Sequence, residues 1–352
     1  MFKLICELGA EVCRENKTDD IVKRLCVITA NRVHLKRYPV DNPVTIFNSS
    51  FVVEDGEIII YARIVLGYFT YASAVAEIFI PHRDIYTETF SGHYTAKIEV
   101  FPNNRFDLWG VEDPRVYEIE GKRYMTYCGR TVNYFDPSIR TERTLPITAV
   151  EEKGKWRKLS VYRLAPELRG FVISDKDAFL FKTRDKLMLF HRLHMSDERF
   201  YAVTSEVPEK SLDSENFQEV TVENTSLVLH AQKFEEKIGW ATPPVKIDNE
   251  YLFLMHSVEK ETKIYRVFAL LMDRNLEITA VTPRYILEPS EPYEVFGDRP
   301  FVVFPCGAQV IDDSLLISYG AADSAVVIGE IKIDELMSIF DTSKVNGGKY
   351  VV

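Results

Sequence analysis

The chain of 352 residues is long enough for one large domain or two ordinary ones, and its 46 % apolar residues can form a sizeable core. Its formal net charge of −10 argues against a general nucleic-acid-binding protein, which would carry a basic face or stripe. The five cysteines are scattered without a Cys-x-x-Cys pair, no apolar run reaches membrane-spanning length, and the start lacks a secretory-signal pattern, so we expect a cytoplasmic protein without a membrane span.

Short runs of β-branched and aromatic residues, separated by turn residues, predict strands along nearly the whole chain. A short helix is predicted at residues 19–26 (DDIVKRLC) and another at residues 334–340 (DELMSIF). Between them, five segments share one plan: a polar or small entrance, a strand, a tight polar turn and a second strand with a polar or cationic end. In chain order they are residues 47–63, 111–130, 176–192, 242–257 and 306–323.

These five segments recur at a nearly constant spacing. Their second strands end at intervals of about 62 to 67 residues, near Arg63, Arg130, Arg192, His256 and Gly320. A period of this length, with room for a hairpin and two more strands, is typical of a four-stranded propeller blade. We therefore predict an all-β fold, a single five-bladed β-propeller over residues 1–352, in which residues 1–40 and 331–352 are terminal extensions or blade-closing segments.

The repeat also predicts where polar residues gather. In an antiparallel hairpin, the start of the first strand and the end of the second lie at the same end. If each hairpin is the inner half of a blade, these ends meet at one mouth of the central channel. The entrances supply Asn48, Ser49, Glu112, Asp113, Lys176, Asp177 and Thr242, and the exits supply Arg63, Arg130, Arg192, His256 and Asp323. Ionisable groups at matching ends favour a ligand site over purely structural hairpin ends.

The stretch Glu-Asp-Pro-Arg at residues 112–115 stands at the second entrance. An Asp-Pro pair can simply start a turn, but at a repeat entrance it predicts a general acid at Asp113, held rigidly by Pro114. Strand alternation would turn Glu112 to the opposite face, where it would brace a cation of a neighbouring blade. The same alternation would put Arg115 on the face of Asp113 and let it orient that side chain.

Several cations at the same mouth predict a site for phosphate or carboxylate, because guanidinium groups match such oxyanions in bidentate fashion. They are Arg63, Arg130, Lys176, Arg192 and His256. The alternative is a structural ring in which these cations pair with Glu112, Asp177 and Asp323.

Other signals are weaker. His191 and His194 would face opposite sides of a strand, so we expect no metal pair there. Trp240 fits either a sugar-stacking residue or a core residue.

A set of motifs occurs in order over residues 43–330: FNSS with YAR, EDPR, KDAFLF with LFHR, IGWATPP with MHS, and YEVFGDRPFVVFPCG with YGAAD. This ordered set resembles glycoside hydrolase family 130, the β-mannoside phosphorylases and related mannosidases. The five-bladed propeller of that family agrees with the fold predicted from the repeat. The segments GWATPP and LMHSV depart from the family's usual pattern on the acceptor side.

The resemblance implies inverting phosphorolysis of a β-1,4-linked mannosyl donor to α-mannose 1-phosphate, with inorganic phosphate as co-substrate and no metal or organic cofactor. Asp113 matches the family's proton donor, which is thought to act through the mannosyl 3-hydroxyl. Substrate-binding positions are Asn48, Ser49, Arg63, Asp177 and Asp323, and phosphate-side positions are Arg130, Lys176, Arg192 and His256.

The expected partners are a β-mannoside oligosaccharide and inorganic phosphate, with no nucleic acid and no membrane, and a homo-oligomer stays open. One alternative is an inverting β-mannosidase on the same propeller, which would need a water-activating carboxylate such as Asp177 or Glu294. The other is a non-catalytic carbohydrate-binding propeller, which would explain the repeat but not the ring of acids and bases.

Overall fold

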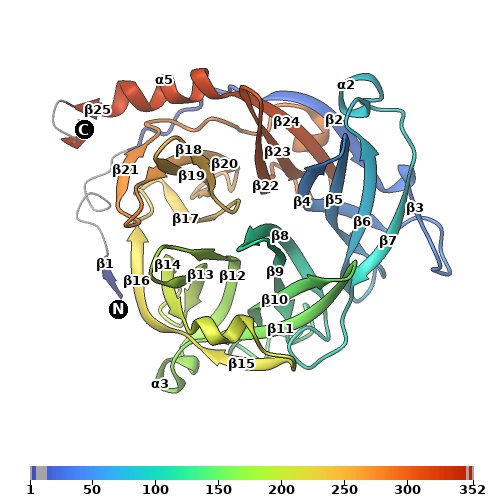
Figure 1. Cartoon of the computed structure of the whole chain (residues 1–352), viewed down its shortest axis with the longest axis horizontal. Helices are drawn as coiled ribbons and strands as arrows, with labels where there is room; N and C mark the ends of the chain where they lie inside the picture. Colours follow the sequence, from blue (N-terminus) through green and yellow to red (C-terminus); the bar gives the residue numbers. More distant parts are fainter. Residues whose placement is uncertain (1, 5–13, 346–348, 351–352) are drawn as a thin grey trace.

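Five sheets surround a central axis in the computed structural model, which describes residues 2–4, 14–345 and 349–350 (Figure 1). Blade 1 contains β4 (Thr45–Glu54), β5 (Glu57–Val65), β6 (Ser73–Pro81), β7 (Tyr94–Val100) and β3 (Val33–Leu35). Blade 2 contains β8 (Val111–Ile119), β9 (Lys122–Arg130), β10 (Thr144–Glu152), β11 (Lys155–Arg163) and β15 (Gln218–Thr221). Blade 3 contains β12 (Val172–Lys182), β13 (Leu187–Met195), β14 (Phe200–Val207), β16 (Glu223–Leu229) and β1 (Lys3–Leu4).

The last two blades complete the ring, and the predicted all-β five-bladed propeller is confirmed. Blade 4 contains β17 (Glu235–Trp240), β18 (Val245–Ile247), β19 (Glu250–Glu259), β20 (Tyr265–Met272) and β21 (Ile278–Val281). Blade 5 contains β22 (Val303–Ile311), β23 (Ser314–Ala321), β24 (Ala325–Lys332) and β2 (Lys23–Thr29). The five predicted hairpins are the pairs β4–β5, β8–β9, β12–β13, β18–β19 and β22–β23.

Helices are few and short in the described part of the chain. They are η1 (Ala30–Arg32), α2 (Asp84–Thr87), α3 (Pro166–Arg169), η2 (Glu209–Leu212), α4 (Pro292–Val295) and α5 (Ile333–Ser343). After α5, the short strands β25 (Lys344–Val345) and β26 (Lys349–Tyr350) pair antiparallel. Within the described residues, we find no helix with the length and apolar character needed to cross a bilayer.

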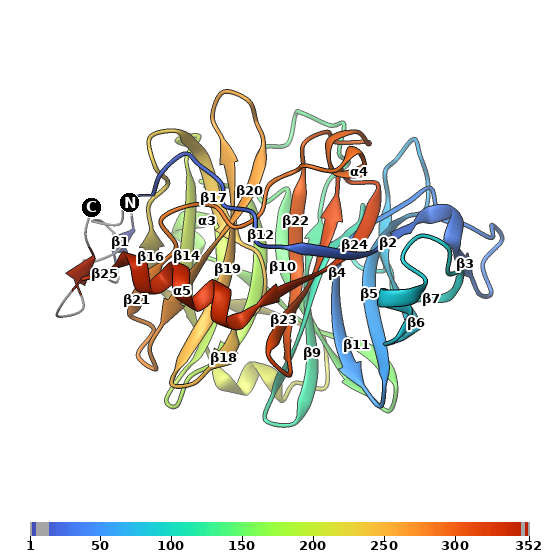
Figure 2. The same ribbon diagram turned by 90° about the horizontal axis from the view of Figure 1, so that it is seen from above.

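The two predicted helices have different outcomes. The one at residues 334–340 is confirmed as α5, which lies on the outer side of the disc and buries Leu336 and Phe340 (Figure 2). The one at residues 19–26 is wrong, because this segment leads into strand β2. Val27 packs into one core cluster, whereas Cys26 and Ile28 pack into another, which is the two-residue period of a strand with both faces covered.

Strand β2 joins the two ends of the chain. It pairs antiparallel with β24, so that Val27 lies opposite Val327 and the fifth blade combines residues 23–29 with residues 303–332. The ring is therefore closed by hydrogen bonds between segments about 300 residues apart in the sequence.

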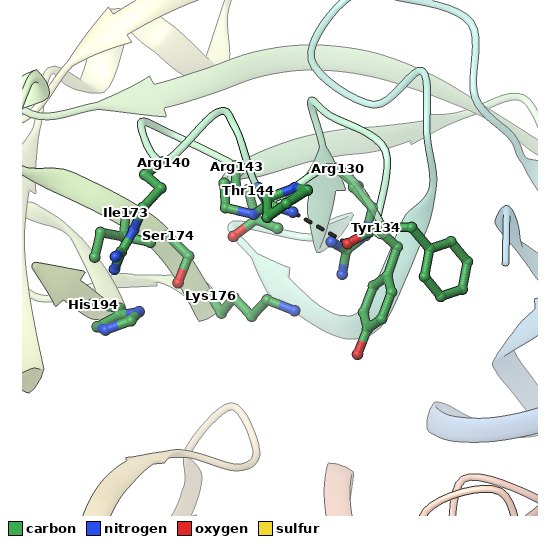
Figure 3. A pocket seen from close by; sticks show the side chains of 11 residues that line it. Arg130, Tyr134, Arg140, Arg143, Thr144, Ile173, Ser174, Lys176 and His194 are labelled. Atoms are coloured by element: carbon green, nitrogen blue, oxygen red, sulfur yellow. Dashed lines mark hydrogen bonds between the residues drawn. The ribbon is translucent and has the colours of Figure 1, made fainter. Parts of the chain in front are cut away.

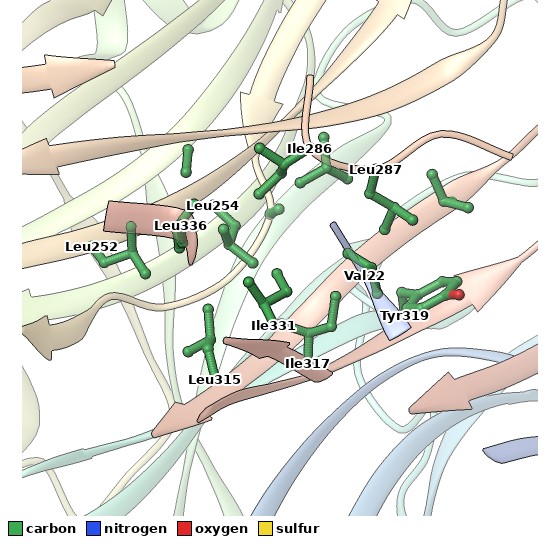
Figure 4. Packing of buried hydrophobic residues seen from close by; sticks show 14 of the residues in the cluster. Val22, Leu252, Leu254, Ile286, Leu287, Leu315, Ile317, Tyr319, Ile331 and Leu336 are labelled. Atoms are coloured by element: carbon green, nitrogen blue, oxygen red, sulfur yellow. The ribbon is translucent and has the colours of Figure 1, made fainter. Parts of the chain in front are cut away.

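The core lies between neighbouring blades. Between blades 4 and 5, Leu252 and Leu254 of β19 pack with Leu315 and Ile317 of β23, and Leu336 of α5 covers them (Figure 4). These side chains are almost completely buried. Full burial of one such side chain contributes about 1.5–3 kcal/mol, so each blade interface stabilises the ring strongly.

The innermost strands share an irregularity near one mouth of the channel. The strand register shifts around Asn48 in β4, around Asp113 in β8 and around Asp177 in β12. These three residues adopt the left-handed conformation, with φ of 45°, 54° and 56°. A bulge of this kind bends the strand and redirects its side chains, so the three blades present a polar residue to the same space.

Candidate active site at one mouth of the channel

A cavity of about 770 Å³ lies at this mouth and is lined by residues from all five blades. It gathers most of the residues predicted from the repeat: Asn48, Arg63, Asp113, Arg130, Lys176, Asp177, Arg192 and Asp323. The sequence repeat therefore located the cavity, because matched hairpin ends converge as the antiparallel geometry requires.

Ser49 and His256 do not line the cavity. Ser49 is fully buried, and its carbonyl oxygen accepts a hydrogen bond from the Ser318 hydroxyl. His256 is also fully buried, with its Nε2 at 3.4 Å from Asp177 Oδ2. Burial lowers the pKa of His256 to about 3, because the charge of Asp177 does not offset desolvation. His256 is therefore a neutral support behind Asp177.

Glu112 and Asp113 both line the cavity, so the expectation that alternation would separate them is wrong. The reason is the bulge, since the left-handed Asp113 interrupts the two-residue period between Glu112 and Arg115. One guanidinium contacts both acids: Arg63 Nη2 lies 2.9 Å from Glu112 Oε1, and Nη1 lies 3.0 Å from Asp113 Oδ1.

Glu112 braces three cations, which confirms part of its predicted role. In addition to Arg63 it contacts Arg130 Nε at 2.8 Å and Lys176 Nζ at 3.0 Å. Burial alone would raise the pKa of Glu112, but Arg130, Arg63 and Lys176 outweigh burial and hold the pKa well below its usual value. Glu112 is therefore a permanently ionised anchor for the cations around it.

Asp113 is only half engaged. Its Oδ1 accepts hydrogen bonds from Asn48 Nδ2 at 2.8 Å and from Arg63 Nη1 at 3.0 Å. No donor among the described residues reaches Oδ2, which leaves that oxygen to a ligand. Arg115 does not touch the carboxyl group: it donates to the backbone oxygens of Asp113, Trp240 and Ala241. It holds the backbone of Asp113 in place and ties blade 2 to blade 4.

Asp177 has an ion-pair contact at each of its two carboxylate oxygens. It accepts a hydrogen bond from Arg192 Nε and lies 3.7 Å from Arg115 Nη2. Burial would raise its pKa, but the charges of Arg192 and Arg115 and the hydrogen bond from Arg192 lower it below its usual range. Glu294 lies elsewhere: it is buried in the capping box of α4 and accepts a hydrogen bond from Tyr319 at 2.6 Å.

Asp323, which follows the second strand of the blade 5 hairpin, differs from both Asp113 and Asp177. It has the left-handed conformation with φ of 51° and lines the cavity. Burial raises the pKa of Asp323 to about 6, although Arg63 and Arg299 act against it. This carboxyl group therefore changes its charge close to neutral pH.

Two cations of the cavity wall, Lys237 and Arg299, were missed by the sequence analysis. Lys237 Nζ lies over the rings of Phe200 and Tyr265, at 5.0 and 5.7 Å from their centroids, and the Arg299 guanidinium lies 4.9 Å from the centroid of Tyr265. Neither has a carboxylate within salt-bridge distance among the described residues. Burial, together with Arg192 and Arg299, lowers the pKa of Lys237 to about 7.

The omission has a structural cause. The predicted fourth hairpin starts at Thr242, which is buried and does not line the cavity. Blade 4 instead divides its inner position between β17 and β18, and the mouth is reached by β17. Lys237 stands immediately before the motif IGWATPP, and this position was the available signal.

Aromatic loops cover part of the cavity. Tyr71 and Tyr134 come from different blades, yet their ring centroids lie 6.2 Å apart, and the Tyr71 hydroxyl donates to Asp298. Tyr68 and Phe135 line the same cavity and are largely exposed. These loops lie outside the hairpin repeat, so the repeat gave no signal for them.

The structure also places Trp240, which the sequence left open, and the two histidines expected on opposite faces of a strand. Trp240 is fully buried, and its Nε1 donates to the carbonyl oxygen of His191 at 3.1 Å. The His191 ring contacts Asp175 and Ser205, whereas His194 on the other strand face lines the cavity. The described part of the chain holds no group of three His, Cys, Asp or Glu residues suited to a metal ion.

Comparisons with known proteins point to one family. Residues 12–342 match the profile of glycoside hydrolase family 130, described as beta-1,4-mannooligosaccharide phosphorylase. The chain is 27 % identical over 232 residues to a beta-1,2-mannobiose phosphorylase of Thermoanaerobacter sp. (strain X514), covering 65 % of this chain and 69 % of that protein. It is 28 % identical over 108 residues to a beta-1,4-mannooligosaccharide phosphorylase of Ruminococcus albus, covering 29 % and 32 %.

The fold also resembles a solved structure. A beta-1,2-mannobiose phosphorylase from Listeria innocua, solved as a complex with beta-1,2-mannobiose, superposes with a TM-score of 0.72 at 19 % identity. The superposition covers 91 % of this chain and 99 % of that one.

Proposed function

The chain belongs to glycoside hydrolase family 130, and we propose that it catalyses inverting phosphorolysis of β-mannosides, with inorganic phosphate as the second substrate. The family match confirms the expectation of a glycoside phosphorylase, and the reaction, the linkage and the residue roles are the proposal.

One observation carries the proposal: the half-engaged carboxylate of Asp113 shares its cavity with cations that lack a carboxylate partner. Lys237 and Arg299 are the cations without such a partner among the described residues, and Arg192 and Lys176 stand beside them in the lining. An inverting hydrolase needs a second carboxylate to activate water. Phosphate is itself a nucleophile, so one acid and a cluster of cations suffice.

The proposed step keeps the atoms in balance. A phosphate oxygen forms a bond to the anomeric carbon from the face opposite the leaving sugar, and the glycosidic C–O bond breaks. The proton from Asp113 reaches the glycosidic oxygen through the mannosyl 3-hydroxyl, as the family resemblance implies. The products are α-mannose 1-phosphate and a sugar shortened by one mannose. Cationic side chains stabilise the charge that develops on the phosphate side.

Residue roles follow from these positions. Asn48 and Arg63 fix one oxygen of Asp113 and, with Asp323, form the wall where we place the mannose. Lys176, Arg192 and the newly found Lys237 form the wall where we place the phosphate.

Ser49 is buried next to Asn48, and His256 is buried behind Asp177, so we assign both to supporting the cavity wall. Asp177 lines the cavity, but its carboxylate is occupied by Arg192, so we assign it to positioning Arg192.

The alternative hydrolase lacks support from its named carboxylates. Asp177 is neutralised by its partners, and Glu294 is buried against Arg24 and Tyr319, away from the cavity lining. A mannosidase would need a free carboxylate opposite Asp113 to activate water.

The linkage expected from the sequence is β-1,4, which agrees with the description of the family, whereas the relative with the longer alignment acts on a β-1,2 bond. The test therefore offers β-1,4-mannobiose and β-1,2-mannobiose separately, with and without inorganic phosphate. We expect phosphate-dependent release of α-mannose 1-phosphate, with the anomer identified by NMR. Release of free mannose at an equal rate without phosphate would contradict the proposal.

We also propose that no metal ion takes part. Dialysis of the protein against a chelator should leave the rate of phosphorolysis unchanged, and a rate restored only by an added divalent ion would refute this.

A further inference from the structure

A cavity of about 520 Å³ occupies the opposite mouth of the central channel, on the side of the hairpin turns. All five blades line it, with Phe51 of β4, Tyr117 of β8, Phe181 of β12, Pro243 before β18 and Gln309 of β22. Figure 2 shows the disc from its edge, with α4 near the face of the reaction cavity and β18 near the other face. We call this second cavity the turn-side cavity.

The turn-side cavity is separate from the reaction cavity, because the two share no lining residue. Between them, the fully buried Arg115 donates hydrogen bonds from blade 2 to the backbone oxygens of Trp240 and Ala241 in blade 4. The backbone N–H of Val116 donates to Ser50 Oγ of blade 1 at 3.0 Å. A ligand in the turn-side cavity is therefore kept apart from the reacting atoms.

A smaller cavity of about 130 Å³ extends the turn-side cavity outward, since Ile119, Glu120 and Lys182 line both. It leads between blades 2 and 3 to η2, where Leu212 forms part of its wall. The two cavities together form one elongated groove. This shape fits a chain of linked units better than a small ion.

The turn-side cavity lacks the cationic character of the reaction side. Near the reaction centre, Figure 3 shows a wall that includes three arginines and Lys176. In the turn-side cavity, both bases have acidic partners. Arg123 lies 3.0 Å from Glu151, and Lys182 pairs with Glu209. No unpaired cation of the described residues is left in this lining, so the cavity does not suit phosphate.

The free polar groups of the lining include both acceptors and donors. Glu118 and Glu120 are exposed, and neither forms an ion pair with a described residue, so their carboxylates are free to accept hydrogen bonds. Gln309 is oriented, because its Oε1 accepts a hydrogen bond from Val53 N at 3.0 Å. Its amide Nε2 then remains as a donor. A hydroxyl group both donates and accepts, so this combination matches a sugar.

Two half-buried rings add flat apolar surface. Tyr117 is fixed, because its hydroxyl forms a hydrogen bond with Thr126 and its ring stacks on Tyr124. Phe181 contacts Tyr251 and two phenylalanines edge to face, so no parallel ring of the described residues covers it. Flat rings beside a few oriented polar groups are suited to the C–H face and the hydroxyl groups of a sugar ring.

We propose that the turn-side cavity is a non-catalytic binding site for an oligosaccharide chain. The inference rests on the proposed function for the identity of the sugar, which we take to be a β-mannoside. The site holds an oligosaccharide on the face opposite the reaction cavity and thereby keeps further substrate close to the enzyme.

The first experiment counts bound sugar by isothermal titration calorimetry. The probes are β-1,4-mannotetraose and β-1,2-mannotetraose, each without phosphate so that the proposed reaction does not proceed. We expect two bound molecules of one probe per wild-type chain. Phe181→Ala should weaken one of the two sites about tenfold, because a ring no longer stacks on the sugar.

A second variant covers the case that Phe181→Ala fails to fold. Glu118→Lys changes an exposed residue and should weaken the same site several-fold, because a carboxylate acceptor is lost. Glu57→Lys is the matched control, since Glu57 is exposed beside the equivalent turn of blade 1 and lines neither cavity. This control should still bind two molecules with the wild-type affinities.

The second experiment places the site outside the reaction. The kcat and KM for phosphorolysis of mannobiose should be the same in Glu118→Lys as in the wild type, because the disaccharide is cleaved in the other cavity. A changed kcat in Glu118→Lys would contradict a non-catalytic role.

One bound tetraose per wild-type chain, or two that Phe181→Ala and Glu118→Lys leave unaffected, would overturn the inference. A turn-side cavity that binds spermine but neither tetraose would also overturn it and assign the free carboxylates to a cation. The proposed function fails separately. A chain that binds two tetraose molecules but releases no mannose 1-phosphate would refute only the reaction, whereas phosphate-dependent cleavage with one bound tetraose would refute only the turn-side site.

Discussion

Asp113 and Asp177 occupy the same kind of position in neighbouring blades, yet their surroundings give them opposite properties. Both stand at a bulge of the innermost strand, both have the left-handed conformation, and both line the cavity. Asp113 keeps Oδ2 free of donors from the described residues, whereas Asp177 is surrounded by Arg192, Arg115 and His256. The repeated backbone aims the side chain, and the neighbouring cations decide whether it can react.

The largest expected effect comes from removing the free acid. Asp113→Asn should lower the rate of phosphorolysis by about 10²–10⁴-fold, which is the usual contribution of a general acid. The thermal unfolding midpoint should change little, because Arg63 keeps its contact with Glu112. The rate and the midpoint are measured on the same preparation, and a variant with undiminished turnover would remove Asp113 from its assigned role.

The second prediction concerns Asp177, the equivalent residue of the neighbouring blade, where we expect a loss of stability. Asp177→Asn leaves the buried Arg192 and Arg115 without their carboxylate, and breaking a buried ion pair costs about 3–5 kcal/mol. We expect the free energy of unfolding, measured with denaturant, to fall by about 3 kcal/mol. A stability loss as small as that of Asp113→Asn would show that the two aspartates are not different in kind.

The sequence repeat predicted the positions of Asp113 and Asp177, but not the difference between their surroundings. Five hairpins at an even spacing give the propeller and place both aspartates at one mouth. The strand alternation used to separate Glu112 from Asp113 failed, because the sequence carries no clear sign of a bulge whose residue 113 is left-handed. A rule for regular strands cannot anticipate a local break in their period.

Lys237 was missed for a different reason. Its blade replaces one inner strand by two, and the break between β17 and β18 falls at Pro243 and Pro244, which cannot donate to a sheet. The predicted hairpin starts only at Thr242, so Lys237 lay outside it. The aromatic loops were missed because they lie between repeats. Sequence periodicity predicts the scaffold of a propeller, whereas its connecting loops carry no such signal.

The third prediction tests the cationic wall of the cavity where we place the phosphate. Lys237→Met should raise the KM for phosphate by about 10- to 100-fold, because a hydrogen bond between charged groups contributes about 1.5–3 kcal/mol. Lys246→Met is the matched control, since Lys246 lies exposed in the same blade and does not line the cavity. An equal KM for phosphate in both variants would show that Lys237 does not bind phosphate.

The same lysine gives a prediction for pH. The pKa of Lys237 is lowered to about 7, so its charge is present below this pH and disappears above it. The KM for phosphate should therefore rise as pH increases beyond about 7, and Lys237→Arg should flatten this dependence because arginine stays charged. A wild-type KM for phosphate that stays constant between pH 6 and 9 would contradict this expectation.

The smallest effect concerns Asp323. Its pKa is raised to about 6 in the folded protein, above the usual value near 4, so the folded state binds the proton more tightly than the unfolded state. The resulting contribution to stability is present below about pH 4 and decreases as pH rises to about 6. Asp323→Asn should remove this slope in unfolding curves recorded at a series of pH values, and an unchanged slope would assign it to other groups.

The pairing of strand β2 with β24, which closes the ring, limits how early the complete fold can form. Strand β2 finds its partner β24 only after some 300 further residues have been synthesised, and such distant pairing forms slowly. Asn48 and Asp323 belong to the two blades that this pairing joins, and both line the cavity. During refolding, we expect the rate of phosphorolysis to recover later than the strand content does. The recovery of enzyme activity would then report when the ring closes.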